Sequence, residues 1–157
     1  MSKFHINRYD KKSRELIQSA LQTGAPVLDV GRGRQFGENQ FEGYQITPPE
    51  NIKYLTLDVR DEPEPNFVAD LSQLPVGDSQ VSVVFIESVL EHVAPVSKLT
   101  DCMNEIHRIL IDNSGIVVGW VPFCYHFHGG NFPDGNRFTY DGIERLLGKF
   151  SDMWIQP

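Results

Sequence analysis

The sequence has few cysteines, no basic cluster and no long apolar run, and each absence excludes a class of protein. Two cysteines, Cys102 and Cys124, occur in 157 residues. Their separation matches no metal-binding or redox spacing, so we expect reduced thiols and a cytoplasmic protein. The longest apolar run, residues 116–123, is too short to cross a bilayer. The first eight residues also lack the apolar core of a signal peptide, so no membrane partner is expected.

The charge balance of the chain is acidic. Fourteen Lys and Arg residues stand against 21 Asp and Glu, giving a formal net charge of −7 and a pI near 5.1. An acidic chain without a basic stretch is poorly suited to bind phosphate backbones, so we do not expect nucleic acid as a partner. The apolar fraction of 40% is that of an ordinary globular protein, and the length predicts a single domain.

Short apolar runs alternate with helical patterns or long connections along the chain. The runs predicted as strands are residues 26–30, 54–58, 66–69, 81–86 and 116–121. Helical periodicity is found at 99–110, at 143–149 and at 10–23, where one face holds Leu16, Ile17, Ala20 and Leu21. Residues 34–53 show little periodicity and predict a loop, with a short extended piece at 44–47. This order is typical of an α/β fold with a doubly wound, mostly parallel sheet of about five strands.

Glycines and carboxylates follow the predicted strands at the edge where open α/β sheets bind ligands. Gly31 and Gly33 follow the first strand, where they permit either a simple tight turn or the close approach of a ligand. Asp58 ends the second strand and either caps it or accepts hydrogen bonds from vicinal ribose hydroxyls. Asp70 ends the third strand and can accept from an exocyclic amine. Together these strand ends favour a nucleoside-like ligand.

Several motifs, in their order along the chain, resemble those of class I S-adenosylmethionine-dependent methyltransferases. They are Val27-Leu28-Asp29-Val30-Gly31-Arg32-Gly33, Leu57-Asp58, Val68-Ala69-Asp70-Leu71-Ser72-Gln73-Leu74-Pro75 and Ser88-Val89-Leu90-Glu91-His92-Val93. The later segment with His128, Asp134 and Arg137-Phe138-Thr139 is similar to one branch that acts on small molecules. The resemblance covers about residues 25–150. It implies a Rossmann-like sheet, S-adenosylmethionine as cofactor, and methyl transfer to an oxygen or nitrogen of a small-molecule acceptor.

The resemblance implies roles for five residues at the methionine end of the cofactor. Gly31 and Gly33 would pass the methionine part, with Asp29 bracing their turn. Glu87 and Ser88, just past the fourth strand, would face the amino acid end and the methyl group.

Three further residues would hold the nucleoside end. Asp58 would bind the ribose hydroxyls, while Asp70 and the backbone of Leu71 would frame the adenine. The single domain would then consist of an N-terminal helical segment, a cofactor-binding core, and an acceptor-side loop with the last helix, at residues 1–24, 25–123 and 124–157.

The sequence departs from the family pattern in two places. A small residue is usual near position 34 or 35, whereas this chain has Arg34-Gln35-Phe36; Arg32 and Arg34 either approach the cofactor's carboxylate or crowd its pocket. The family sheet has seven strands, but residues 153–157 can at most begin the sixth. We expect either a shortened chain or a partner, such as a second copy, on the exposed edge beside the fifth strand. These departures favour the rival function, a non-catalytic interaction or assembly module.

Methyl transfer from a sulfonium requires few catalytic groups, because the leaving group is already activated. A hydroxyl acceptor would benefit from a base, and His126 and His128 are the candidates, while His92 is interpreted as a hydrogen-bonding residue. His126, His128 and Asp134 also resemble a metal site, but ordinary polar loop residues are the simpler interpretation, so no metal is predicted. The absence of Gly-x-Gly-x-x-Gly argues against a nicotinamide-dependent dehydrogenase.

An aromatic loop follows the fifth predicted strand. Its rings either wall an acceptor pocket or close the core beneath the loop, and they belong to Phe123, Tyr125, Phe127, Phe132 and Phe138. We assign Phe123 and Phe138 to the core and leave the other three open.

Overall fold

The computed structural model describes residues 11–32, 39–128, 130, 132–153 and 155. Its elements in chain order are α1 (Lys11–Leu21), β1 (Val27–Val30), α2 (Gln40–Gly43), β2 (Tyr54–Asp58), β3 (Phe67–Val68), β4 (Val83–Glu87), the short 3-10 helices η2 (Leu90–His92) and η3 (Val96–Lys98), α3 (Leu99–Ile109), β5 (Ile116–Trp120) and α4 (Tyr140–Leu146). In the described part of the chain, every helix is too short or too polar to traverse a lipid bilayer.

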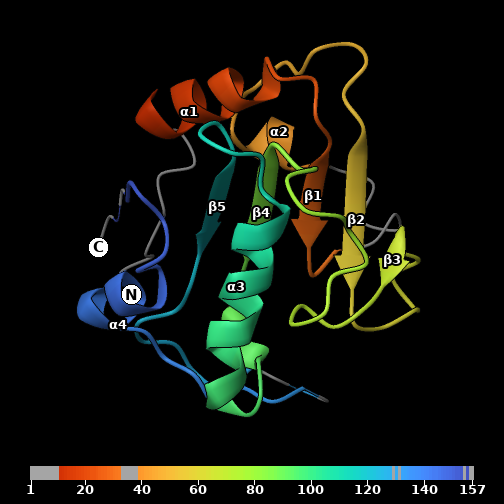
Figure 1. The fold of residues 1–157 in the computed structure, drawn as a ribbon. Helices are drawn as coiled ribbons and strands as arrows, with labels where there is room; N and C mark the ends of the chain where they lie inside the picture. The colour runs from red at the N-terminus through yellow and green to blue at the C-terminus, as the bar shows by residue number, and fades with distance from the viewer. Residues whose placement is uncertain (1–10, 33–38, 129, 131, 154, 156–157) are drawn as a thin grey trace.

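The five strands form one parallel sheet in the order β3-β2-β1-β4-β5. Val27 of β1 lies beside Tyr54 of β2 on one side and Val83 of β4 on the other. The chain therefore reverses its direction of strand addition between β1 and β4, and ligands bind at such a point, outside the carboxyl ends of the strands. These ends are at the bottom of the sheet in Figure 1. The predicted α/β class and five-stranded sheet are confirmed.

Each face of the sheet buries its own core. Alternate strand residues point to opposite faces, so Leu28 and Val84 pack toward α3 with Met103 and Ile106. In Figure 1, α3 crosses the sheet on the side nearer the viewer. The opposite face is covered by α1 and α2 and buries a second set of side chains: Ile17, Ala20, Leu21, Val27, Phe41, Tyr44, Ile46, Val83 and Phe85.

The segment predicted as a loop at residues 34–53 contains the short helix α2, so that prediction was wrong. The side chain of Asn39 caps the helix by accepting a hydrogen bond from the Phe41 backbone N–H. The ring of Phe41 packs edge-on against Phe85 of β4, with ring centroids 6.0 Å apart. The extended piece predicted at 44–47 is also wrong, because Tyr44 is the C-terminal cap of α2 and Gln45 has a φ of 53°.

Other differences concern individual positions. Leu16 is 42% exposed although it was predicted to share the buried face of α1, and Phe123 is 61% exposed although it was predicted to close the core. Phe138 does pack against the α3 side of the core. The fourth strand is displaced toward its carboxyl end relative to the predicted 81–86, since Val81 forms an isolated bridge with Leu110 instead.

The outer edge beside β5 agrees with the sequence-based expectation. Within the described residues, β5 pairs with β4 on one side and with no strand on the other. Its side chains are mostly half-buried, unlike the buried residues that fill β4.

Candidate functional site

Three predicted cofactor residues form what we call the strand-end row: Gly31, Asp58 and Glu87. Val30 of β1 lies opposite Leu57 of β2 and Ile86 of β4, so the next residue in each strand lies at the same level. The backbone N–H of Gly31 donates to the Leu57 carbonyl at 2.7 Å and keeps the row together. A cavity of about 240 Å³ opens at this level, and its lining residues are Val30, Gly31, Arg32, Gln40, Glu87 and Trp120.

Gly31 is required both for its backbone conformation and for the space it leaves. Its φ is +79°, which side-chain-bearing residues rarely adopt, and an added Cβ would lie 2.6 Å from Cγ2 of Val89. The tight turn considered from the sequence is therefore present, and the close approach of a ligand remains a prediction. Gly33 and Arg34 lie outside the described residues, so their predicted roles remain predictions.

Asp29 lies on β1, two residues before Gly31, and is 1% exposed. Its Oδ2 accepts a 2.6 Å hydrogen bond from the Tyr54 hydroxyl, and Nε of Arg32 is 3.5 Å away. Its Oδ1 is buried and accepts no hydrogen bond within the described residues. Burial raises the pKa of Asp29 to about 6, against the opposing effects of Tyr54 and Arg32. This carboxyl therefore favours a cationic ligand group nearby.

Asp58 ends β2 and keeps one oxygen available to a ligand. Its Oδ1 accepts from the Arg60 backbone N–H at 2.9 Å, with Nε of Arg60 at 3.6 Å. Its Oδ2 accepts no hydrogen bond from the residues that the structure describes. The side chain is 8% exposed, so a hydroxyl that reaches it would be largely shielded from competing water.

Asp70 and Leu71 follow β3, farther along the same edge. Asp70 Oδ1 accepts from the backbone and hydroxyl of Ser72, while Oδ2 accepts from Lys98. Burial acts to raise the pKa of Asp70, but the hydrogen bonds from Lys98 and Ser72 outweigh it and the net shift is downward. The side chain of Leu71 is buried in the core on the α3 side, which leaves its backbone as the part that can face a ligand.

The two residues predicted at the methyl end have different surroundings. Glu87 Oε1 accepts from the Tyr44 hydroxyl at 3.1 Å, which links the strand-end row to α2. Ser88 has a φ of +54°, and its hydroxyl donates to Oε1 of Glu91. Glu91 itself is 0% exposed. Ser88 is thus the connection between the row and a second polar group beneath the loop after β5.

This second group, the Glu91 cluster, comprises Glu91, His92 and His128. Nε2 of His128 lies 3.6 Å from Glu91 Oε1, and its Nδ1 lies 3.4 Å from Oδ2 of Asp134. Arg137 binds both carboxylate oxygens of Asp134, at 2.7 and 3.0 Å, and holds the pKa of that carboxyl far below its usual range.

His126, the other predicted base, is exposed and has no place in this cluster. Its ring stacks on Tyr125 with centroids 4.3 Å apart. The combination of His126, His128 and Asp134 considered from the sequence is therefore not the one that the structure assembles; Glu91 and His92 of η2 complete the group instead.

The loop that carries His128 also reaches across to β2. The ring of Phe132 lies 5.9 Å from that of His92, and the Arg60 guanidinium lies over Phe132 at 4.3 Å from its centroid. Since Arg60 also contacts Asp58, the loop approaches the Asp58 end of the strand-end row as well as the Glu91 cluster. Tyr125 and Phe127 remain more than half exposed.

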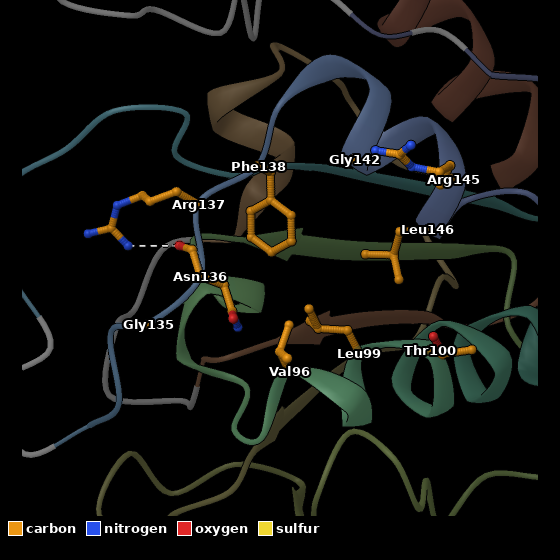
Figure 2. Close-up of a pocket in the computed structure, with 10 residues that line it drawn as sticks. All are labelled: Val96, Leu99, Thr100, Gly135, Asn136, Arg137, Phe138, Gly142, Arg145 and Leu146. Carbon is orange, nitrogen blue, oxygen red and sulfur yellow. Dashed lines mark hydrogen bonds between the residues drawn. The ribbon is translucent and has the colours of Figure 1, made fainter.

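A larger cavity, of about 480 Å³, lies between η3, the start of α3 and the segment around α4. Figure 2 shows Phe138 and Leu146 pointing into it, while Arg137 extends away. It contains none of the residues predicted for the cofactor. Of these two cavities, the smaller one is lined by residues predicted for the cofactor, and the larger one lies on the predicted acceptor side.

Sequence reasoning missed several residues around the site. Tyr54 and Trp120 were treated as strand residues, Gln40 as part of a loop, and Glu91 as part of a motif without a role. The alternation of β2 contained a usable signal, because Tyr54, Thr56 and Asp58 share one face.

Comparisons with known proteins support the fold. No curated protein sequence matches the chain. Among solved structures, a methyltransferase in complex with the Haloferax volcanii Trm112 methyltransferase activator is 19% identical, with a TM-score of 0.61 over 87% of this chain and 68% of that one. An S-adenosylmethionine-dependent methyltransferase from Aquifex aeolicus is 15% identical, with a TM-score of 0.57 over 89% and 82%. At these identities the likeness shows the fold.

The family assignment comes from the sequence profile of the methyltransferase domain, which matches residues 28–118. The matched region is more than half of the chain, and it contains the strand-end row together with Asp29, Asp70 and Glu91. The protein therefore belongs to the methyltransferase domain family and is an S-adenosylmethionine-dependent methyltransferase at the level of that family.

Proposed function

We propose that this protein transfers the methyl group of S-adenosylmethionine to an oxygen or nitrogen of a small molecule, and that the strand-end row holds the cofactor. The observation that carries this proposal is the cavity at Gly31, Arg32 and Glu87, located where the strand order reverses. Such a position is where open α/β sheets bind nucleotides.

The charges around this cavity suit the cofactor. S-Adenosylmethionine carries a positive sulfonium, a positive ammonium and one carboxylate. Asp29 and Glu87 supply negative charge near the methionine end, and Arg32 supplies a positive group for the carboxylate. The buried oxygen of Asp29 without a hydrogen bond is stabilised when a cationic group comes near.

The nucleoside part of the cofactor would lie along the same edge of the sheet, beside the ends of β2 and β3. Oδ2 of Asp58 would accept from the ribose hydroxyls. Asp70 and the Leu71 backbone would frame the adenine, with the amine of the base sharing Asp70 with Lys98. Gly31 would leave room for the methionine chain. These assignments follow from position and hydrogen-bonding capacity.

The reaction itself requires alignment more than catalytic groups. The acceptor atom approaches the methyl carbon in line with the carbon–sulfur bond. That bond breaks, its electron pair stays on sulfur to give S-adenosylhomocysteine, and the acceptor loses a proton. His128 is better placed than His126 to act at the acceptor, because it lies beside the Glu91 that Ser88 contacts.

The segment after β5 is the proposed acceptor side. It borders both the Glu91 cluster and the larger cavity lined by Phe138 and Leu146. A cavity of about 480 Å³ is within the range that binds drug-sized molecules. We assign to it a small acceptor with an apolar part.

Calorimetric titration of the purified chain with S-adenosylmethionine and S-adenosylhomocysteine tests the proposal, with NADH as a control. Asp58→Asn should weaken cofactor binding by about 10- to 100-fold, the usual cost of a hydrogen bond to a charged group. Asp61→Asn, at an exposed carboxylate on the turn that follows β2, is the matched control and should bind as the unaltered protein does. Unchanged affinity in Asp58→Asn would refute the assigned ribose site.

A second candidate function is a non-catalytic interaction module, favoured by the unpaired side of β5. The Haloferax volcanii relative is seen in complex with an activator protein, and by analogy the edge of β5 is a possible docking place for a partner or a second copy of this chain. A folded protein that binds neither S-adenosylmethionine nor S-adenosylhomocysteine would establish this alternative.

A further inference from the structure

Three side chains that commonly bind metals converge between η2 and the loop after β5. One ligand atom from each of Glu91, His92 and His128 lies within 4.8 Å of the other two. The two imidazole rings meet edge to face, with centroids 5.1 Å apart. Two imidazoles and one carboxylate are a donor set that suits divalent transition metals.

The carboxyl group of Glu91 is buried, and the described residues around it leave one of its oxygens without a hydrogen bond. The residue is 0% exposed, and its Oε2 accepts no hydrogen bond within the described residues. Its Oε1 accepts from the neutral hydroxyl of Ser88. Arg137, a nearby cation, is bound by both of its terminal nitrogens to Asp134. A buried, unpaired carboxylate oxygen is costly unless a cation approaches it.

Both histidines are held in the form that a metal requires. Nδ1 of His92 lies 2.6 Å from the carbonyl oxygen of Pro133, which can only accept, so Nδ1 is the donor and Nε2 is the nitrogen that a metal ion could bind. Nδ1 of His128 faces Oδ2 of Asp134, and its Nε2 faces Glu91. Metal-binding histidines characteristically donate their second nitrogen to a carbonyl or carboxylate in this way.

We propose that Glu91, His92 and His128 bind one divalent transition-metal ion of the Zn²⁺ class. Hard ions such as Mg²⁺ and Ca²⁺ prefer sets made of oxygen alone, which two imidazoles do not provide. A tetrahedral ion with bonds of roughly 2.0–2.1 Å holds its ligand atoms about 3.3 Å apart. A small inward rotation of the side chains therefore completes the set, and a fourth position stays open.

The proposed ion adds a catalytic group to the proposed methyl transfer, and this role of the ion rests on that proposed function. It would lie beside Ser88, at the methyl end of the row, where the ion would lower the pKa of an acceptor hydroxyl and would replace His128 as the group that promotes loss of the proton. It would also join the loop after β5 to η2, two segments that are already linked by hydrogen bonds from the Gly135 and Asn136 backbone to the Glu91 carbonyl.

The test is direct binding, independent of methyl transfer. The full chain is stripped with a chelator and titrated calorimetrically with Zn²⁺, and with Co²⁺ to record its visible absorption. We expect one ion per chain. His128→Ala and Glu91→Gln should each weaken Zn²⁺ binding by at least about 10-fold, since even residues that only orient a ligand contribute that much. His126→Ala, two residues from His128 on the same loop, is the matched control and should bind Zn²⁺ normally.

Folding and cofactor binding are followed in every variant by circular dichroism and titration with S-adenosylhomocysteine. Glu91→Gln keeps the shape of the side chain, so it remains informative if His128→Ala does not fold. Absence of Zn²⁺ and Co²⁺ binding in a chain that binds S-adenosylhomocysteine would overturn the metal site and leave the proposed function standing. Zn²⁺ binding that is lost in His126→Ala but kept in Glu91→Gln would also overturn it. Zn²⁺ binding without cofactor binding would support the ion and contradict the function.

Discussion

Replacing Gly31 with alanine tests whether the turn after β1 is shaped by its contact with η2. Two separate costs follow from the structure. A residue with a Cβ at a φ of +79° costs about 1–2 kcal/mol. The new Cβ would also lie 2.6 Å from Cγ2 of Val89, which forces a shift that costs about 1–3 kcal/mol. Gly31→Ala should therefore lower the free energy of unfolding by about 2–5 kcal/mol.

Gly24 provides a matched control for this substitution. Its φ is +73°, close to that of Gly31, but an added Cβ would meet no atom within 4 Å. Gly24→Ala should thus show the backbone cost alone, about 1–2 kcal/mol. Val89→Ala in the Gly31→Ala background should recover part of the steric cost, because it removes the methyl group that the new Cβ meets.

Urea unfolding followed by circular dichroism compares five proteins: the unaltered chain, Gly31→Ala, Gly24→Ala, Val89→Ala and the Gly31→Ala/Val89→Ala double variant. Titration with S-adenosylhomocysteine reports on the cofactor site. Gly31→Ala should also bind the cofactor more weakly, because Gly31 lines the smaller cavity. Equal destabilisation by Gly31→Ala and Gly24→Ala, or no coupling with Val89→Ala, would refute the argument that η2 packs against this turn.

Two further predictions concern Asp29 and Asn136. Because burial raises the pKa of Asp29 from 3.8 to about 6, the folded state binds more protons between these values, and this group lowers stability as pH rises through that window. Denaturant titrations should therefore show that, between pH 4 and pH 7, the free energy of unfolding of Asp29→Asn rises by on the order of 3 kcal/mol relative to that of the unaltered protein. A difference between the two proteins that does not change with pH would contradict the burial argument. Asn136→Ala should lower the free energy of unfolding by about 2–3 kcal/mol, since Nδ2 of Asn136 donates to the buried Leu90 carbonyl and to the half-buried Val93 carbonyl. A change below about 0.5 kcal/mol, as at surface sites, would show that water replaces these bonds.

The sequence-based predictions were accurate where an element depends on residues close together in the chain, and wrong where it depends on residues far apart. The bounds of β2 agree with the predicted 54–58, and α3 begins at the predicted Leu99, because their patterns are local and complete. By contrast, α2 has four residues and depends on packing of Phe41 and Tyr44 against Phe85, more than 40 residues away in the chain. No local pattern contains that contact.

The candidate site divides in the same way. Gly31, Asp58 and Glu87 could be placed at one edge because parallel strands bring their carboxyl ends together. The Glu91 cluster could not be assembled from the sequence, because it joins η2 to His128 through the path of a loop without regular structure. The exposure of Phe123 depends on that same path.

The hydrogen bonds between Asn136 and η2 bear on the order in which this protein can acquire its structure. The segment 88–93 follows directly from the interior strand β4. However, the Leu90 and Val93 carbonyls accept hydrogen bonds from a residue that lies more than 40 positions later in the chain. A nascent chain that ends before Asn136 would hold the strands of the sheet but not a fixed η2. The predicted division into a core at 25–123 and an acceptor-side segment at 124–157 would then describe positions along the chain and not parts that fold independently. Removal of residues 124–157 should therefore leave the segment 88–93 without a fixed conformation.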